Sequence, residues 1–104
     1  MGYYTRMEKY TPHCKLSTIK SLLELGKVRA TQSALSGGAA LGLDFVKMLE
    51  VINGLKSSNF YKSMTTHANN RIWQDVYRPV IQAGEVYLKL TVIDDVLIVS
   101  FKEL

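Results

Sequence analysis

Two lysines, a tyrosine and a glutamine could act together on an anion: Lys62, Gln74, Tyr87 and Lys102. Each lies in a stretch where apolar and polar residues alternate, which is typical of a β-strand. Their ammonium, phenol and amide groups donate hydrogen bonds and are no metal-ligand set, so a site built from them would bind an anion such as a phosphodiester. The alternative is that these residues simply cover a solvated strand face, where lysine and tyrosine are common.

Such a group of side chains suits cleavage of RNA without a metal ion. The ribose 2′-hydroxyl is a nucleophile already held beside the phosphorus atom, and this placement removes much of the entropic barrier. The protein then has to stabilise the extra negative charge and to move two protons. Because the group contains no histidine, Tyr87 or a lysine has to move them. Neighbouring cations would bring their reference pKa values of about 10 and 10.4 closer to neutral pH.

Four predicted strands have to position these residues, and they cover the ranges 60–66, 72–78, 85–93 and 96–102. Short connections rich in turn residues separate them, and Asp94-Asp95 predicts a two-residue turn between the last two strands. An antiparallel meander is therefore the expected sheet.

Alternation along the strands predicts which side chains share a face. In the third strand Tyr87, Lys89 and Thr91 are opposite to an apolar row, namely Val86, Leu88, Leu90 and Val92. In the fourth strand Ser100 and Lys102 are predicted to be opposite to Leu97, Val99 and Phe101. Lys62, between Phe60 and Met64, either snorkels at an edge or lines a site. The sequence does not decide which face Gln74 lies on, because the apolar residues Ile72 and Val76 lie two positions away and share its side of the strand.

Helices are predicted before the sheet. The spacing of Leu16, Ile19 and Leu22-Leu23 indicates an amphipathic helix with Ser17 as its N-cap and Gly26 as its stop.

Two further helices follow. Thr31 is expected to cap a short helix through Leu35 that Gly37-Gly38 interrupts, and "GGAALG" lacks the spacing and the lysine of a phosphate-binding loop. Asp44 is expected to cap a helix that ends at Asn53-Gly54. Helices followed by a sheet predict an α+β fold in which three helices pack on one face of the antiparallel meander and leave the other face free.

Length and composition predict one domain over residues 1–104. The chain is 47% hydrophobic and 21% charged, as in ordinary globular proteins. Residues 1–15 show no periodicity, and we expect residues 1–6 to be mobile. No apolar run reaches the roughly 20 residues of a membrane span, and the start lacks the apolar core of a secretory signal, so we expect a cytoplasmic protein.

Cysteine and histidine usage predicts neither a metal site nor a cofactor. Cys14, His13 and His67 are the whole set, which provides no zinc ligands of the C-x-x-C type. His13 and Cys14 could form a base and a nucleophile, but adjacent residues seldom face each other, so we expect an ordinary surface thiol.

The net charge of +4 comes from residues 1–30, which carry six Lys and Arg against two Glu. Lys20, Lys27 and Arg29 are therefore candidate contacts to an RNA backbone, and a solvated helix face is the alternative.

Six stretches of the chain resemble, in order, the MqsR family of mRNA-cleaving toxins from bacterial toxin–antitoxin pairs: "EKYTPH", "LGLDF", "NFYKSMTTH", "IWQDVYRP", "VYLK" and "VIDDVLIVSFKE". The resemblance runs from Met7 to the C-terminus. It implies an α+β fold similar to the RelE and YoeB toxin ribonucleases. It also implies cleavage of mRNA at sites containing GCU or GCA, without the ribosome.

The resemblance also implies roles for the residues introduced above. Lys62 and Lys102 would hold the phosphate and stabilise the transition state, Tyr87 would move a proton, and Gln74 would orient the phosphate or a base edge. Arg78, in "YRP", would contact RNA, or else form a salt bridge at a strand end. His67 is either a general base or a solvated turn histidine.

The partner implied by the resemblance is an antitoxin of MqsA type. Its zinc-binding part would bind the toxin by strand addition, at a sheet edge or at the hydrophobic surface beside it. Its helix-turn-helix part would bind operator DNA, so this chain would contact DNA only indirectly. Two alternatives to an enzyme remain open: a catalytically inactive RNA-binding or corepressor module that acts with the antitoxin, and a structural adaptor. The sequence departs from the family pattern in the Gly37-Gly38 segment, "VINGLKSSN", "HANN" and the N-terminal "MGYYTR", so the exact cleavage triplet is not decided.

Overall fold

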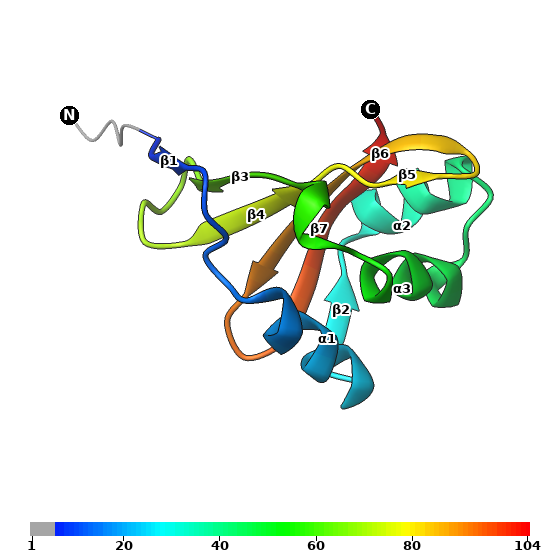
Figure 1. Ribbon diagram of the computed structural model, residues 1–104, viewed down its shortest axis with the longest axis horizontal. Coiled ribbons are helices and arrows are strands. Elements are labelled where there is room, and N and C mark those ends of the chain that lie inside the picture. Colours follow the sequence, from blue (N-terminus) through cyan, green and yellow to red (C-terminus); the bar gives the residue numbers. More distant parts are fainter. Residues whose placement is uncertain (1–5) are drawn as a thin grey trace.

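The computed structural model describes residues 6–104, and in it three helices cover one face of a mostly antiparallel sheet (Figure 1). The α+β prediction is confirmed. Residues 1–5 lie outside the described part, so the expected mobility of the N-terminal extension stays a prediction. Among residues 6–104, no helix is long and apolar enough to cross a membrane.

The sheet has seven strands within residues 6–104. They are β1 (Glu8–Lys9), β2 (Val28–Ala30), β3 (Phe60–Thr65), β4 (Trp73–Tyr77), β5 (Val80–Ile81), β6 (Gly84–Val92) and β7 (Val96–Glu103). The strand order is β1-β3-β4-β6-β7-β2, and β5 pairs with β6 alone. The central strands β3, β4, β6 and β7 form the predicted meander.

The sequence did not reveal strands β1 and β2 at the two edges. β1 pairs antiparallel with β3, and β2 pairs parallel with β7. Strands of two and three residues are too short to show a period, so their conformation depends on the neighbouring strand. The predicted two-residue turn is also wrong by one residue: Val92 pairs with Val96, which leaves residues 93–95 as the turn.

Helix α1 (Leu16–Glu24) begins earlier than its predicted cap. Its N-cap is Lys15, which makes no side-chain capping bond, and Ser17 lies within the helix. The predicted stop at Gly26 is confirmed. The Gly26 N–H donates to the Leu23 carbonyl (3.0 Å), the Lys27 N–H donates to the Leu22 carbonyl (2.9 Å), and Gly26 has a φ of 71°, which favours glycine.

Helix α2 (Gln32–Ala40) is capped by Thr31 as predicted: its hydroxyl accepts from the Ala34 N–H at 3.0 Å. The predicted interruption at Gly37-Gly38 is wrong, because the helix continues through both glycines. A Cβ atom on Gly37 would lie 1.9 Å from the Phe101 carbonyl oxygen, and one on Gly38 would lie 2.5 Å from Met48 Sδ. The two glycines therefore let α2 approach β7 and α3 closely.

Helix α3 (Phe45–Asn53) confirms both of its predicted ends. The Asp44 carboxylate accepts from the Lys47 N–H at 2.9 Å, and Gly54 is the C-cap. A 3₁₀ turn, η1 (Ser57–Asn59), then leads into β3.

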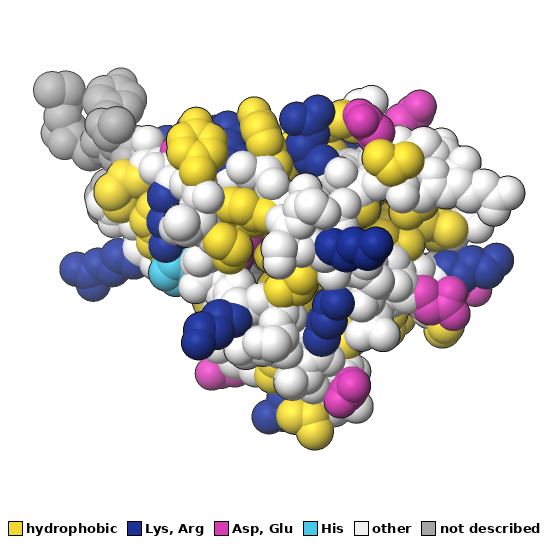
Figure 2. Space-filling model, viewed as in Figure 1, with side chains coloured by type: hydrophobic (Ala, Val, Ile, Leu, Met, Phe, Trp, Pro, Cys, Tyr) yellow, Lys and Arg dark blue, Asp and Glu magenta, His cyan; other side chains and the backbone are white. Residues whose placement is uncertain are grey.

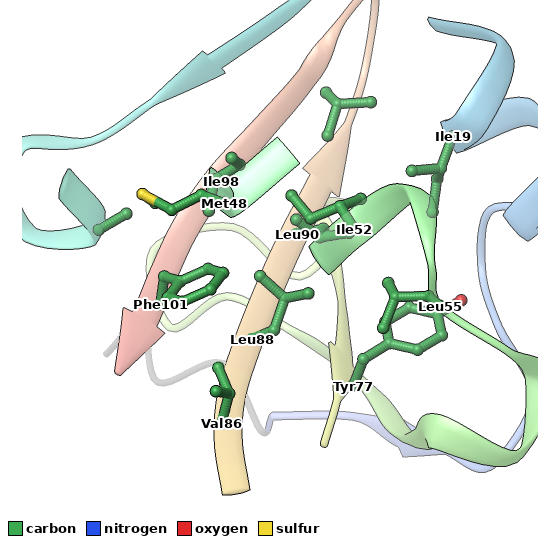
Figure 3. Packing of buried hydrophobic residues seen from close by; sticks show 12 residues of the cluster. Ile19, Met48, Ile52, Leu55, Tyr77, Val86, Leu88, Leu90, Ile98 and Phe101 are labelled. Carbon is green, nitrogen blue, oxygen red and sulfur yellow. The ribbon is translucent and has the colours of Figure 1, made fainter. Parts of the chain in front are cut away.

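The core lies between the helices and one face of the sheet (Figure 3). The described core includes Ile19, Met48 and Ile52 from the helices, Tyr77 from β4, Val86, Leu88 and Leu90 from β6, and Ile98 and Phe101 from β7. The predicted apolar row of β6 is thus buried except for Val92, which is half-buried.

The apolar row predicted for β7 is only partly correct. Lys89 pairs with Ser100, but its neighbour Leu90 pairs with Ile98, so β7 has a bulge at this point. The extra residue changes the alternation. As a result Ile98 and Phe101 face the core, whereas Leu97 and Val99 are only half-buried.

The chain before α1 is fixed to the sheet although it has little regular structure. The buried Asp75 carboxylate accepts from the backbone N–H groups of His13 (3.0 Å) and Cys14 (2.9 Å). The His13 ring stacks on Trp73 with centroids 5.5 Å apart, and Lys9 Nζ lies 4.3 Å from the Trp73 ring centroid. This segment leads back to β1, and so Asp75 helps to hold β1 beside β3.

We expect Asp75→Asn to destabilise the protein by about 1–3 kcal/mol. An amide at this position would turn an N–H donor toward one of the two backbone N–H groups and leave that group unpaired in the interior. Urea denaturation would measure the loss, and limited proteolysis should show faster cleavage within residues 6–15. Asp94→Asn, in the exposed 93–95 turn, is the matched control and should change neither measurement.

Candidate active site

The open face of the sheet, opposite to the helices, carries the candidate residues. Lys62 pairs with Val76, Val76 with Lys89, and Lys89 with Ser100, so these four side chains point the same way. The core residues Tyr77 and Leu88, one position along β4 and β6, pair with each other and point the opposite way.

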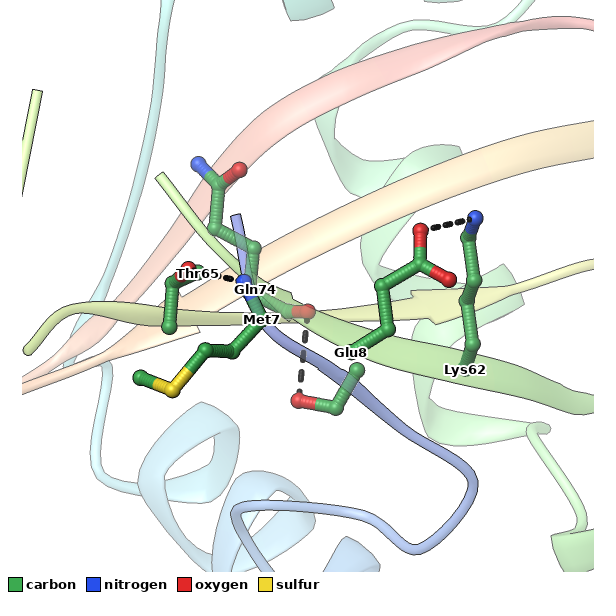
Figure 4. A network of polar contacts seen from close by, with 6 residues as sticks. Met7, Glu8, Lys62, Thr65 and Gln74 are labelled. Atoms are coloured by element: carbon green, nitrogen blue, oxygen red, sulfur yellow. Dashed lines mark hydrogen bonds and ion pairs between the residues drawn. The ribbon is translucent and has the colours of Figure 1, made fainter. Parts of the chain in front are cut away.

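The side of Gln74, which the sequence left undecided, follows from this register. Gln74 is two residues from Val76 along β4 and therefore shares the open face with Lys62. In Figure 4 the Gln74 amide and the Lys62 ammonium project to the same side of β3 and β4. Tyr87 is likewise two residues from Lys89 along β6, and it pairs directly with Lys102.

The four predicted residues form a strip instead of one tight cluster. Tyr87 and Lys102 are in contact range, with Lys102 Nζ 5.4 Å from the Tyr87 ring centroid. Gln74 lies on the other side of the Lys62–Val76–Lys89 row, roughly 13 Å from Tyr87 along the strand direction, counting four residues at about 3.3 Å each. We refer below to Lys62, Gln74, Tyr87, Lys89 and Lys102 as the cationic strip.

Lys62 makes an ion pair with Glu8 at the edge of this strip. The Lys62 Nζ to Glu8 Oε1 distance is 2.7 Å (Figure 4). The pairing of β1 with β3 places Glu8 opposite Met64. The hydrogen bond from the Lys62 ammonium to the Glu8 carboxylate raises the pKa of Lys62. Lys62 therefore carries a positive charge at neutral pH, and only about 20% of its side chain is exposed.

Lys89 belongs to the same face, and the sequence analysis did not include it among the site residues. It is half-buried, and its pKa is lowered by burial first, and then by Arg6 and Lys102 nearby. The strand alternation had placed Lys89 beside Tyr87, so the signal was present. What the sequence could not reveal was its burial and the cations around it.

The candidate RNA contacts outside the strip are spread over the molecule. Arg78 follows β4, and its guanidinium lies 4.8 Å from the Tyr61 ring centroid. Within residues 6–104 it forms no ion pair. Lys20 belongs to α1, on the helix side, and the exposed Lys27 follows the α1 stop.

Arg29 lies in β2 at the far edge of the sheet and is paired with Asp95. The Nε to Oδ2 distance is 2.6 Å and the Nη2 to Oδ1 distance is 3.2 Å. This pair raises the pKa of Arg29 and lowers that of Asp95. Lys20 and Lys27 belong to α1 and the residues just after it, and Arg29 is opposite Leu97, five residues before Lys102 on β7. These three residues therefore do not form one patch with the strip. On the face shown in Figure 2, basic side chains are separated by uncharged and apolar groups.

The two histidines and the cysteine lie away from the strip. His67 is exposed in the connection between β3 and β4. Burial and the Asp75 carboxylate raise the pKa of the Cys14 thiol, which keeps it protonated and unreactive. Among residues 6–104, no three His, Cys, Asp or Glu side chains come close enough together to hold a metal ion.

The fold and the candidate site define a small basic α+β protein with lysine, tyrosine and glutamine side chains on the open face of its sheet. Comparison with known proteins is more specific. Residues 11–103 match the model of a family described as "Motility quorum-sensing regulator, toxin of MqsA". The chain is also 62% identical over 97 residues to the mRNA interferase toxin MqsR of Escherichia coli (strain K12), which covers 93% of this chain and 99% of that protein. The chain belongs to the MqsR toxin family, and the resemblance inferred from the six stretches is confirmed.

Proposed function

We propose that this chain is the toxin of a bacterial toxin–antitoxin pair and acts as a metal-independent endoribonuclease on mRNA. Membership of the MqsR family supports the proposal, and its E. coli relative is named an mRNA interferase. The observation that supports the chemistry is the shared open face, where Lys62, Tyr87 and Lys102 present two ammonium groups and a phenol on the side of the sheet opposite to the core.

The mechanism begins with attack of the ribose 2′-oxygen on the adjacent phosphorus atom. The Lys62 and Lys102 ammonium groups stabilise the negative charge that develops on the phosphoryl oxygens. Tyr87, beside Lys102, donates its phenolic proton to the departing 5′-oxygen, because an alkoxide leaves poorly without a proton. Gln74, further along the strip, orients the RNA through its amide. The products are a 2′,3′-cyclic phosphate and a 5′-hydroxyl.

The substrate sites we propose contain GCU or GCA, and the inhibitor is an antitoxin of MqsA type. The family description names MqsA as the partner of these toxins. The short edge strands β1 and β2 offer backbone groups for strand addition, which gives affinity through main-chain hydrogen bonds. Contact with DNA would then occur only through the antitoxin.

Incubation of the pure protein with a defined RNA containing one GCU and one GCA site, in excess EDTA, tests the proposal. We expect cleavage at these sites with cyclic phosphate ends, and suppression of cleavage by an equimolar MqsA-type antitoxin. RNA that binds but stays intact would instead favour the inactive RNA-binding or corepressor module. Cleavage that appears only after a divalent metal ion is added would contradict the metal-independent mechanism.

Glu8 should weaken RNA binding, because its carboxylate forms an ion pair with the Lys62 ammonium and repels the phosphate groups of RNA. We expect Glu8→Gln to tighten binding of a non-cleavable RNA about 3- to 10-fold, which corresponds to roughly 1 kcal/mol for a partly exposed pair. Fluorescence anisotropy with RNA carrying a 2′-deoxynucleotide at the cleavage site would measure it. Glu24→Gln, at the exposed end of α1, is the control. Equal affinities for the two variants would show that Glu8 does not compete with RNA.

A further inference from the structure

Lys89 occupies the middle of the cationic strip. Its strand, β6, lies between β4 and β7, and its cross-strand neighbours on the open face are the buried Val76 and the half-buried Ser100. Tyr87 is two residues away on the same strand and side, and Lys102 is its diagonal neighbour on β7. An RNA phosphate held between Lys62 and Lys102 would therefore lie over or beside Lys89.

The charges around Lys89 differ from those around Lys62. Lys62 is paired with Glu8, whereas among residues 6–104 Lys89 has no ion-pair partner. Within residues 6–104, the charged and titratable groups that the register and the pKa shift place around Lys89 on this face are Arg6, Glu8, Lys62, Tyr87 and Lys102, and the Glu8 carboxylate is paired with Lys62. Burial and neighbouring cations lower the pKa of Lys89, while Glu8 raises that of Lys62.

Two amines on one face with pKa values pushed in opposite directions are suited to different roles. The amine that stays charged stabilises negative charge. The amine that loses its proton more readily can accept one, since a general base works best when its pKa approaches the working pH. This division solves a problem of the mechanism above, in which Tyr87 donates a proton and no group yet accepts one.

We infer that the neutral Lys89 amine is the general base that takes the proton from the ribose 2′-hydroxyl. This inference rests on the proposed ribonuclease function. As the bond from the 2′-oxygen to phosphorus forms, the 2′ proton passes to Lys89 Nζ and gives an ammonium ion. As the bond from phosphorus to the 5′-oxygen breaks, Tyr87 protonates the leaving oxygen. Return of the proton from Lys89 to Tyr87 through water restores the enzyme.

The test is single-turnover cleavage of a GCU-containing RNA by wild type and Lys89→Arg between about pH 5.5 and 9. Arginine keeps the positive charge but cannot lose a proton in this range. For the wild type the rate should rise with pH up to the pKa of Lys89, because the fraction of neutral amine grows. Lys89→Arg should be about 10²- to 10⁴-fold slower and should lose this rise. Lys47→Met, on the exposed surface of α3, is the control and should match wild type.

A substrate with sulfur in place of the leaving 5′-oxygen separates a base from an acid. Thiolate leaves without a proton, so this RNA should rescue Tyr87→Phe but not Lys89→Arg. Both variants should bind the 2′-deoxy RNA within about threefold of wild type. The inference about Lys89 would be overturned if Lys89→Arg cleaved RNA with the wild-type rate and pH profile. It would also be overturned if the substrate with the 5′-sulfur leaving group restored cleavage by Lys89→Arg. Absence of cleavage by the wild type would instead overturn the proposed function itself.

Discussion

Lys102→Met is expected to slow RNA cleavage by about 10²- to 10³-fold, the usual cost of removing one group that stabilises transition-state charge. Lys102 is exposed on the open face, its ammonium lies 5.4 Å from the Tyr87 ring centroid, and it forms no ion pair within residues 6–104. Its charge is therefore free to act on a phosphate. Single-turnover cleavage of a defined RNA in EDTA would measure the effect.

Two comparisons show whether charge is the cause of that loss. Lys102→Arg keeps the cation at nearly the same place and should remain within about tenfold of wild type. Lys102→Met should keep the wild-type unfolding midpoint, because the side chain is exposed near the end of β7. If Lys102→Met cleaved RNA at the wild-type rate, Lys102 would have no role in stabilising the transition state.

The residues of the open face could be predicted from the sequence because the alternation of side chains along a strand is a local property. Tyr87 and Lys102 were predicted to share a face, and the register pairs them directly. The face of Gln74 was left undecided because the apolar residues Ile72 and Val76 lie on the same side of the strand, and the structure shows that Val76 is fully buried. A buried valine on the open face has a physical reason: Lys62 and Lys89 are its cross-strand neighbours on either side, and their long side chains can cover it.

The features that the sequence missed depend on contacts between distant segments. The bulge that turns Ile98 inward arises from the pairing of β7 with β6, and nothing in "VLIVSF" marks it. The pKa of Lys89 is lowered first by burial in the folded sheet, and then by Arg6 and Lys102, which are 83 positions before it and 13 after it, respectively. The ion pair between Glu8 and Lys62 exists only because β1 adds to β3.

The interruption predicted at Gly37-Gly38 shows most clearly how packing overrides local propensity. Glycine in a helix interior costs about 1 kcal/mol relative to alanine, and two in a row normally indicate a break. Here the absence of side chains lets α2 lie directly against β7, and the burial of the neighbouring core residues offsets the unfavourable helix propensity of the two glycines. The same contact supports the cationic strip from behind, because Phe101 precedes Lys102 on β7.

Gly37→Ala is expected to destabilise the protein by about 2–4 kcal/mol, although alanine is the better helix former. The new Cβ would lie 1.9 Å from the Phe101 carbonyl oxygen and 3.0 Å from its carbonyl carbon, and backbone atoms within a strand cannot turn aside. Thermal unfolding should show a midpoint lower by roughly 10–20 °C for a chain of this size. Gly54→Ala is the matched control, because its Cβ would come no closer than 3.4 Å to any atom beyond its own chain neighbours. This substitution should change stability by less than about 1 kcal/mol. If Gly37→Ala instead raised the midpoint, α2 would not need its close approach to β7, and helix propensity alone would decide the effect.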